Sequence, residues 1–297
     1  MRGSSDARYA GIRIACVVLC ACVSATLTPA GIAVADPPQG AIVAWGRNTE
    51  GQTNVPAPNS GFVAVAAGYW HSLGLRAGGF IVAWGLNNAG QTNVPAPNAD
   101  FIGIAGGGWH SLGLKADGFI VAWGLNNSGQ SNVPTPNADF IGIAAGAYHS
   151  LGLKADGSIV AWGCGGAANY GQCNVPAPNS GFVAIAAGGY HSLGLKADGS
   201  IVAWGDNGDG QCNVPAPNTG FVAVAAVYDH SLAIRRVTGD ADGDGDVDWA
   251  DFAVFVDYMD GPFVEPQLAG WRFFDVDMDD DVDLRDFAAW QNMFTGP

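Results

Sequence analysis

The sequence predicts an all-β propeller of five three-stranded blades, followed by a small helical domain that carries two calcium loops. Three observations lead to this prediction: a repeat of about 40 residues, short apolar runs separated by turn signals, and an acidic C-terminal segment with duplicated spacing. Of the 297 residues, 48% are hydrophobic, only 13% are charged and 44 are glycine. Little charge and abundant glycine favour a sheet-rich body with many turns.

The repeat is visible within the chain itself. Ala-Trp-Gly recurs with tryptophan at positions 45, 84, 123, 162 and 204, and His-Ser recurs with histidine at positions 71, 110, 149, 191 and 230. The spacing is 39 residues, with one interval of 42. A period near 40 residues is typical of propeller blades and solenoid units.

Each unit contains signals for three strands. In the first full unit, apolar runs predict a first strand over residues 62–67 and a second over 71–76. In the next unit, the turn Ala116-Asp117-Gly118 precedes a third strand over 119–123, because Asp-Gly between apolar runs is a strong hairpin signal. The motif that follows, Gly-Gln-Thr-Asn-Val-Pro-Ala-Pro-Asn, contains two prolines and is predicted to be an exposed connector.

The two ends of the repeat array are complementary. The array begins with a lone third strand at 41–46 and ends with a first and a second strand within 221–236. Joining the ends completes the fifth blade and removes exposed sheet edges. We therefore assign residues 36–238 to a closed propeller.

Residues 1–35 have the features of an export signal. Arg2, Arg8 and Arg13 provide a basic start, residues 14–23 are apolar, and Ala33-Val34-Ala35 matches a signal-peptidase site. The chain is therefore expected to be secreted or held at the cell surface, with no membrane span after cleavage. In that oxidising setting, Cys164 and Cys173 are expected to form a disulfide that closes a short loop. Cys212 is then left either unpaired or joined to another chain.

The acidity of the chain is concentrated in residues 239–297, which contain sixteen acidic and two basic residues. Two segments, 240–251 and 275–286, place aspartate at the positions that supply oxygen ligands in calcium loops. The candidate ligands are Asp240, Asp242, Asp244, Asp246, Asp248 and Asp251 in the first loop and Asp275, Asp277, Asp279, Asp281, Asp283 and Asp286 in the second. The segment is predicted to bind two Ca²⁺ ions and to fold with them, the alternative being a disordered acidic tail. No part of the chain offers the basic patch that nucleic acids require.

The repeated His-Ser pair has two interpretations. As chemistry, it suggests a nucleophile and base, or a ring of histidines around a metal. As structure, it suggests a hydrogen bond that pins every blade. A residue present in every blade usually serves every blade, and neighbouring residues on a strand point to opposite faces, so the structural interpretation is favoured and no catalytic residue is assigned.

The residue before each histidine varies between blades. These residues are Trp70, Trp109, Tyr148, Tyr190 and Asp229. Each is expected in the loop that joins the first two strands of a blade, so all five should emerge on one face. Tryptophan and tyrosine are favoured anchors at interfaces, and the face is therefore a candidate binding site for a protein or a glycan. Packing between blades is the alternative role.

Two resemblances add to this interpretation. Residues 186–211, Ala-Ala-Gly-Gly-Tyr-His-Ser-Leu-Gly-Leu-Lys-Ala-Asp-Gly onward, resemble the repeat of the regulator of chromosome condensation family, in the compact form found in secreted β-lactamase inhibitory proteins. Members of that family typically have seven blades, whereas this chain has five copies. In the inhibitory proteins aromatic loop residues grip the target enzyme, which implies a binding role for the same face here.

The C-terminal segment resembles a dockerin, an EF-hand-like module whose helices dock onto a cohesin. The resemblance implies a cohesin-like partner, although loop position 6 is Gly245 in one copy and Asp280 in the other. The predicted function is thus a secreted, non-catalytic binding protein with a calcium-dependent docking module. The alternative is a carbohydrate-active, polysaccharide-degrading enzyme that carries a dockerin, with Asp229 as its candidate acid.

Overall fold

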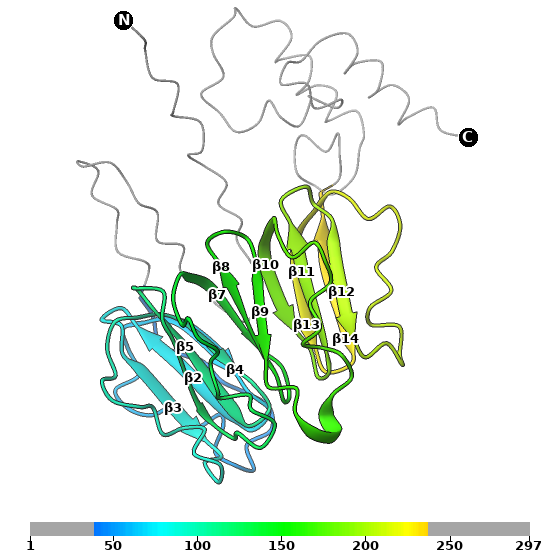
Figure 1. Cartoon of the computed structure of the whole chain (residues 1–297). Helices are drawn as coiled ribbons and strands as arrows, with labels where there is room; N and C mark the ends of the chain where they lie inside the picture. The colour runs from blue at the N-terminus through cyan, green and yellow to red at the C-terminus, as the bar shows by residue number, and fades with distance from the viewer. Residues whose placement is uncertain (1–38, 237–297) are drawn as a thin grey trace, which may run out of the picture. The chain divides into compact units, whose positions relative to one another are not determined.

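The computed structural model describes residues 39–236, which form an all-β, propeller-like array of repeated sheets (Figure 1). The chain divides into two units after Ile234, and the described residues lie almost wholly in the first. Four sheets have three strands in the order of the chain, and a fifth sheet has two. The three-stranded blade predicted from the repeat is therefore confirmed.

The strand bounds follow the repeat closely. The first blade contains β1 (Phe62–Ala67), β2 (His71–Arg76) and β3 (Ile81–Gly85), and the second β4 (Phe101–Gly106), β5 (His110–Lys115) and β6 (Ile120–Gly124). The third contains β7 (Phe140–Ala145), β8 (Ser150–Lys154) and β9 (Ile159–Trp162), and the fourth β10 (Phe182–Ala187), β11 (His191–Lys196) and β12 (Ile201–Gly205). The two-stranded sheet contains β13 (Phe221–Val227) and β14 (His230–Arg235), and a single 3-10 turn, η1, spans Gly166–Ala168.

Within each blade the strands are antiparallel and share one register. In the first blade His71 lies opposite Gly85 and Ser72 opposite Trp84, and the same pairs recur in later blades. The hairpin between the second and third strands turns at a glycine with positive φ, such as Gly118 at 81°, a conformation that favours glycine. This shared register sets the histidine of every complete blade at the same end of its central strand.

The hydrophobic core lies between consecutive blades. One cluster joins Leu73 and Leu75 of the first blade to Phe101, Ile104 and Trp123 of the second. Equivalent clusters join the second blade to the third, the third to the fourth, and the fourth to the fifth. Because each blade buries its apolar face against its neighbour, the array is stabilised mainly by interfaces between repeats.

The fifth blade differs from the prediction. Residues 41–46, predicted to be its third strand, form no strand and no ladder with β14 in the described part of the chain. They do occupy the place of a preceding third strand beside the first blade: Gly40 forms a bridge with Phe62, and the Ile42 backbone N–H donates to Asn59 Oδ1 at 2.7 Å. The same asparagine contact precedes every later blade, as for Ile81 and Asn98.

Two residues of the fifth blade also depart from the repeat. Val227 stands where the other blades have Gly68, Gly107, Gly146 and Gly188, and Ala233 stands where they have Gly74, Gly113, Gly152 and Gly194. A Cβ at Gly107 would lie 2.3 Å from Cε1 of His110, so a side chain at this position displaces the histidine ring. His230 is exposed, whereas His110, which contacts Ser150 of the following blade, is fully buried.

The remaining predictions about domains fall on other parts of the chain. The export signal, the helical domain and all twelve candidate calcium ligands lie outside the described residues. Among the described residues no helix is long and apolar enough to span a membrane.

Candidate functional site

A repeated hydrogen-bond network links each blade to the next. Nε2 of His71 lies 2.9 Å from Oγ of Ser111 in the following blade, and Ser111 Oγ donates to the Gln91 carbonyl at 2.8 Å. The Trp123 indole N–H donates to the same carbonyl at 2.9 Å. Equivalent His–Ser contacts join His110 to Ser150, His149 to Ser192 and His191 to Ser231. The repeated hydrogen bond predicted for the His-Ser pairs is thus observed for four of the five histidines, and it joins each of these blades to the next.

The network fixes the direction of every hydrogen bond. A carbonyl cannot donate, so the serine hydroxyl must donate its proton to the glutamine carbonyl. The serine oxygen must then accept a hydrogen bond from the histidine Nε2–H. The histidine is then neutral with its proton on Nε2, and Nδ1 is buried without a partner in His71, His110, His149 and His191. A histidine in this state donates to serine instead of taking its proton, so these contacts position the blades.

Burial keeps these histidines uncharged. Desolvation lowers the pKa of His71 to about 4, and desolvation with the neighbouring histidines lowers the pKa of His110 and His149 to about 3. The rings are packed against glycine three residues earlier, where no side chain fits. The network is therefore a set of neutral, buried hydrogen bonds between blades, and we call each His–Ser–Gln set a clamp.

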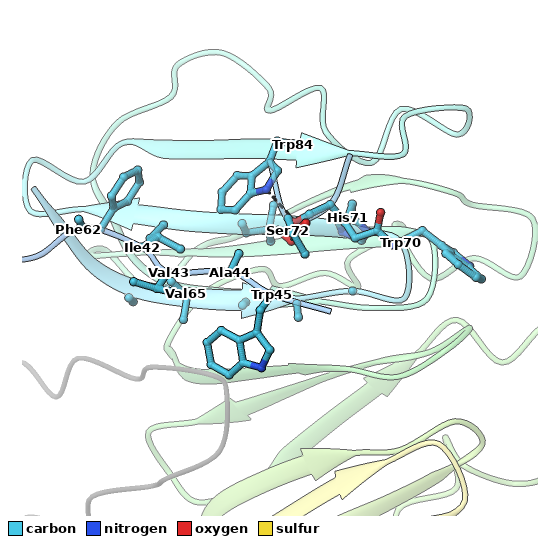
Figure 2. A pocket seen from close by; sticks show the side chains of 18 of the residues that line it. Ile42, Val43, Ala44, Trp45, Phe62, Val65, Trp70, His71, Ser72 and Trp84 are labelled. Carbon is cyan, nitrogen blue, oxygen red and sulfur yellow. Dashed lines mark hydrogen bonds between the residues drawn. The ribbon is translucent and has the colours of Figure 1, made fainter. Parts of the chain in front are cut away.

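The first blade shows how this network is placed relative to the loop. Figure 2 shows His71 and Ser72 within the sheet beside Trp84, while Trp70 points away from them. Trp84 and Ser72 both donate to the Gln52 carbonyl, at 2.9 and 2.8 Å. Trp45 points away from Trp84 and is 84% exposed, so it has no equivalent bond among the described residues.

A continuous run of aromatic side chains lies at the end of the strands where the histidines begin. Trp109 stacks on Tyr148 with ring centroids 5.3 Å apart, and Tyr148 stacks on Tyr190 at 5.8 Å. Tyr69 contacts Trp109 edge-on at 5.4 Å and Tyr228 at 5.7 Å, and Tyr170 contacts Tyr190 at 4.9 Å. We call these six residues the aromatic run.

The structure brings three of the five predicted binding residues together in this run: Trp109, Tyr148 and Tyr190. Trp70 lies outside it and stacks against the guanidinium of Arg47, 4.2 Å from its ring centroid. Asp229 is half-buried in the loop between β13 and β14. All five residues occupy the predicted loops. Trp109, Tyr148 and Tyr190 combine the two predicted roles, because their rings contact one another between blades and remain partly open to solvent.

Sequence reasoning missed three members of the run. Tyr69 and Tyr228 lie two residues before the histidine, where the other blades have Gly108, Ala147 and Gly189. The sequence does carry a signal for them, because a tyrosine stands at a repeat position that holds glycine or alanine in the other blades. Tyr170 belongs to the insertion of the longest repeat and had no equivalent for comparison.

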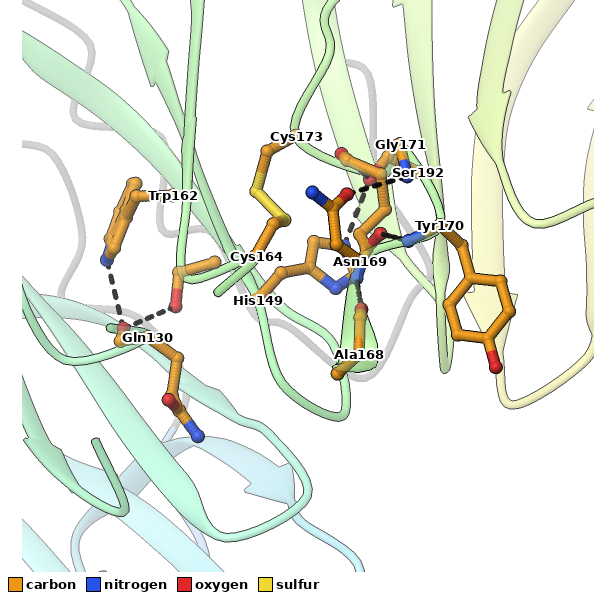
Figure 3. The surroundings of a disulfide bond; sticks show 12 residues. Gln130, His149, Trp162, Cys164, Ala168, Asn169, Tyr170, Gly171, Cys173 and Ser192 are labelled. Atoms are coloured by element: carbon orange, nitrogen blue, oxygen red, sulfur yellow. Dashed lines mark hydrogen bonds between the residues drawn. A yellow bond between two sulfur atoms is a disulfide. The ribbon is translucent and has the colours of Figure 1, made fainter. Parts of the chain in front are cut away.

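The insertion that carries Tyr170 is closed by a disulfide. Cys164 and Cys173 are joined with their Cα atoms 6.0 Å apart, and Cys212 is free (Figure 3). The Tyr170 backbone N–H donates to Gln172 Oε1 at 2.7 Å, and Gln172 is fully buried. The cross-link thus lies at the base of the loop that presents Tyr170 to the run.

The connectors after the third strands are also less exposed than predicted. Gln91, Gln130 and Gln172 are fully buried, because their carbonyls accept the serine and tryptophan bonds that join the blades. Within residues 39–236 no group of three or more histidine, cysteine or acidic side chains is arranged to hold a metal ion.

Comparison with known proteins identifies the repeats. The family model "Regulator of chromosome condensation (RCC1) repeat" matches residues 62–91, 101–130, 140–172 and 182–211. Four RCC1 repeats therefore lie within residues 62–211. The clamp residues recur within these units: each match begins at the first strand of a blade and ends at the glutamine whose carbonyl joins it to the next.

Solved structures show the same RCC1-type fold. Prp20p from Saccharomyces cerevisiae is 20% identical, with a TM-score of 0.52, over 69% of this chain and 60% of that chain. The CRINKLY WD40 ectodomain of the Arabidopsis thaliana receptor kinase ACR4 is 25% identical, with a TM-score of 0.51, over 65% of this chain and 68% of that one. This chain therefore spans less than two thirds of the yeast protein. No curated protein matches the chain significantly.

Proposed function

We propose that the RCC1-repeat body is a non-catalytic binding module that holds a protein partner on the aromatic run. The observation that carries this proposal is the contiguity of six aromatic side chains from five blades and one disulfide-closed loop. Rigid aromatic side chains that are half-buried and half-exposed are favoured anchors in protein interfaces. The clamps beneath them hold the loops in place without taking part in binding.

The geometry favours a protein over a glycan. A sugar ring that stacks on an aromatic platform needs a free ring face. In the run, Trp109, Tyr148 and Tyr190 lie with interplanar angles of 29° and 21°, so they cover part of one another's faces. The structure of the RCC1-type relative Prp20p was described together with its binding to Gsp1p and histones, which supports protein binding as a use of this fold.

Capture from the medium of the source cells tests the proposal. The full-length chain is immobilised, and Trp109→Ala is compared with Phe119→Ala, a matched loss of an exposed aromatic at the other end of β5. We expect Trp109→Ala to weaken capture by at least about tenfold, as for a central anchor, and Phe119→Ala to leave it unchanged. Equal capture by both variants and the wild type would reject the proposal.

For the rest of the chain the proposal rests on sequence alone. Export after residue 35 would bring the chain to the cell exterior. Residues 239–297 would bind two Ca²⁺ ions and dock onto a cohesin-like partner. Replacing Asp240 and Asp275, the first position of each loop, with alanine should abolish calcium binding in isothermal titration of the full chain, whereas Asp198→Ala in the propeller should not.

We also propose that the ring closes through residues 41–46. These residues already hold the place of a third strand beside the first blade, and Val43 is 79% exposed. Leu232 and Ile234 of β14 are also exposed, although their equivalents Leu73 and Leu75 are buried. Pairing these two edges would bury both apolar surfaces and join the first and fifth blades, which both contribute to the aromatic run.

A further inference from the structure

Departures from the repeat gather at one place on the aromatic run. Asp229 replaces the aromatic residue found in the other four loops, and only the first and fifth loops carry tyrosine two residues before the histidine. These two tyrosines, Tyr69 and Tyr228, contact each other across the two ends of the array. Three independent changes therefore converge where the first and fifth blades meet.

The backbone at this place is in an unusual conformation. Tyr228 has a φ of 44°, in the left-handed region that residues with large side chains rarely adopt. The loop is held there by the Gly189 N–H, which donates to the Tyr228 carbonyl at 2.6 Å. Such conformations persist where the surrounding structure requires them, and they gather at functional sites.

Asp229 places a carboxylate among these rings, directly after Tyr228 in the loop between β13 and β14. Burial raises the pKa of Tyr69 and of Tyr190, and the nearby carboxylate of Asp229 raises both further. The carboxylate of Asp206, in a neighbouring loop, accepts hydrogen bonds from the Gly208 N–H and from Gln211 Nε2.

Five basic side chains of the described body contact aromatic rings outside this group. Arg76, Lys115, Lys154 and Lys196 lie over phenylalanine rings at the far ends of the central strands. Arg47 is stacked on Trp70. A cavity of about 460 Å³ opens beside Tyr69 and Tyr228 and is lined mainly by alanine and glycine, with no lysine or arginine among its lining residues.

We propose that Tyr69, Tyr228 and Asp229 form a binding site for the cationic head of a lysine or arginine side chain of the protein partner. Aromatic rings attract an ammonium or guanidinium group through their π electrons, and a carboxylate adds a charge-assisted hydrogen bond. The small, apolar lining of the cavity leaves room for an aliphatic stem. This inference rests on the proposed function, and it names the chemistry of the partner at one end of the run.

A titration of the full-length chain tests the site without the partner. The ligands are lysine and arginine blocked at both backbone ends, with blocked norleucine as the uncharged counterpart of lysine. The indole ¹⁵N–H resonance of Trp109, whose ring contacts Tyr69, reports on the site, and that of Trp162 reports on a distant blade. We expect saturable shifts at Trp109 with both cations and none with norleucine.

Charge-matched variants make the titration specific. Asp229→Asn should weaken cation binding by about tenfold or more, Asp198→Asn at the far end of β11 should leave it unchanged, and Tyr228→Phe should retain it because the ring remains. An equal response to norleucine, no saturable shift, or unchanged binding by Asp229→Asn would overturn the inference.

The outcome can be separated from that of the proposed function. If Trp109→Ala abolishes partner capture and Asp229→Asn leaves it unchanged, the binding face stands and the cation site does not. If Trp109→Ala leaves capture unchanged, the proposed function fails, and the titration still decides whether the cation site exists.

Discussion

At the scale of single residues, the repeat is explained by three side chains, one main-chain carbonyl and one glycine. Histidine donates to serine in the next blade, serine donates to glutamine, and tryptophan donates to the same carbonyl. The glycine three residues before the histidine leaves room for its ring. Each of these groups forms a hydrogen bond or a close contact with another member of the set. The His-Ser pair therefore recurs for a structural reason and is not a nucleophile and base.

Loss of one serine should therefore destabilise the body. Ser150→Ala leaves the buried Nε2–H of His110 without an acceptor. We expect the free energy of unfolding to fall by about 1–3 kcal/mol in denaturant titrations. Ser158→Ala, which removes a hydroxyl from a hairpin turn, is the control and should change it by less than about 0.5 kcal/mol. A similar loss in both variants would contradict the role of the clamps.

The buried histidines also predict a pH dependence. In the unfolded chain they take up protons below pH 6.5, whereas in the folded chain His110 and His149 stay neutral down to about pH 3. The unfolded state thus binds more protons between these values, so stability is full above pH 6.5 and is lost as the pH falls. Each histidine should contribute a slope approaching about 1.4 kcal/mol per pH unit.

The window from pH 6.5 to about pH 5 isolates this effect, because aspartate titrates mainly below it. Urea unfolding at a series of pH values measures the slope, and His110→Gln should reduce it by about one histidine's share. A stability that is flat between these pH values would show that the clamps are not closed in solution.

At the scale of elements, the strands could be predicted well and their contacts less well. The expected strands at 62–67 and 71–76 coincide with β1 and β2, since apolar runs and turn residues mark their ends. The burial of Gln91 could not be predicted, because its main-chain carbonyl makes the contact and a carbonyl has no sequence signal. A glycine replaced by Val227 is visible in the sequence, but its meaning requires the position of the histidine ring.

The join between the two ends of the array gives an element-scale prediction. In the first blade Leu73 lies opposite Ala83, so the same register places Leu232 opposite Ala44. In a Cys212→Ser background, Ala44→Cys with Leu232→Cys should form a disulfide within one chain. The control pair, Ala44→Cys with Ala233→Cys, should not, because neighbouring residues of a strand point to opposite faces.

Non-reducing electrophoresis and intact mass distinguish the outcomes. A cross-linked monomer of the expected register supports the closed five-bladed ring. Cross-linked dimers would show that the edges pair between two chains, and equal cross-linking of the control pair would show that the register is wrong.

At the scale of the whole molecule, the repeated positions join blades and the variable positions form a surface. The sequence pointed to Trp109, Tyr148 and Tyr190 because they vary at a fixed place in the repeat. It could not show that Trp70 turns away to Arg47, or that Tyr69 takes its place in the aromatic run. Those differences depend on which side chains the neighbouring loops place beside each ring, and these neighbours are set only when the blades assemble.

The most direct test of the binding face is amide hydrogen exchange of the full-length chain, free and with its captured partner. The account predicts slower exchange in the loops that carry the aromatic run, at 69–70, 108–109, 147–148, 189–190 and 228–229. Exchange in the hairpins at the other end of the blades, such as 116–118, should not change. Protection confined to those hairpins would contradict the account.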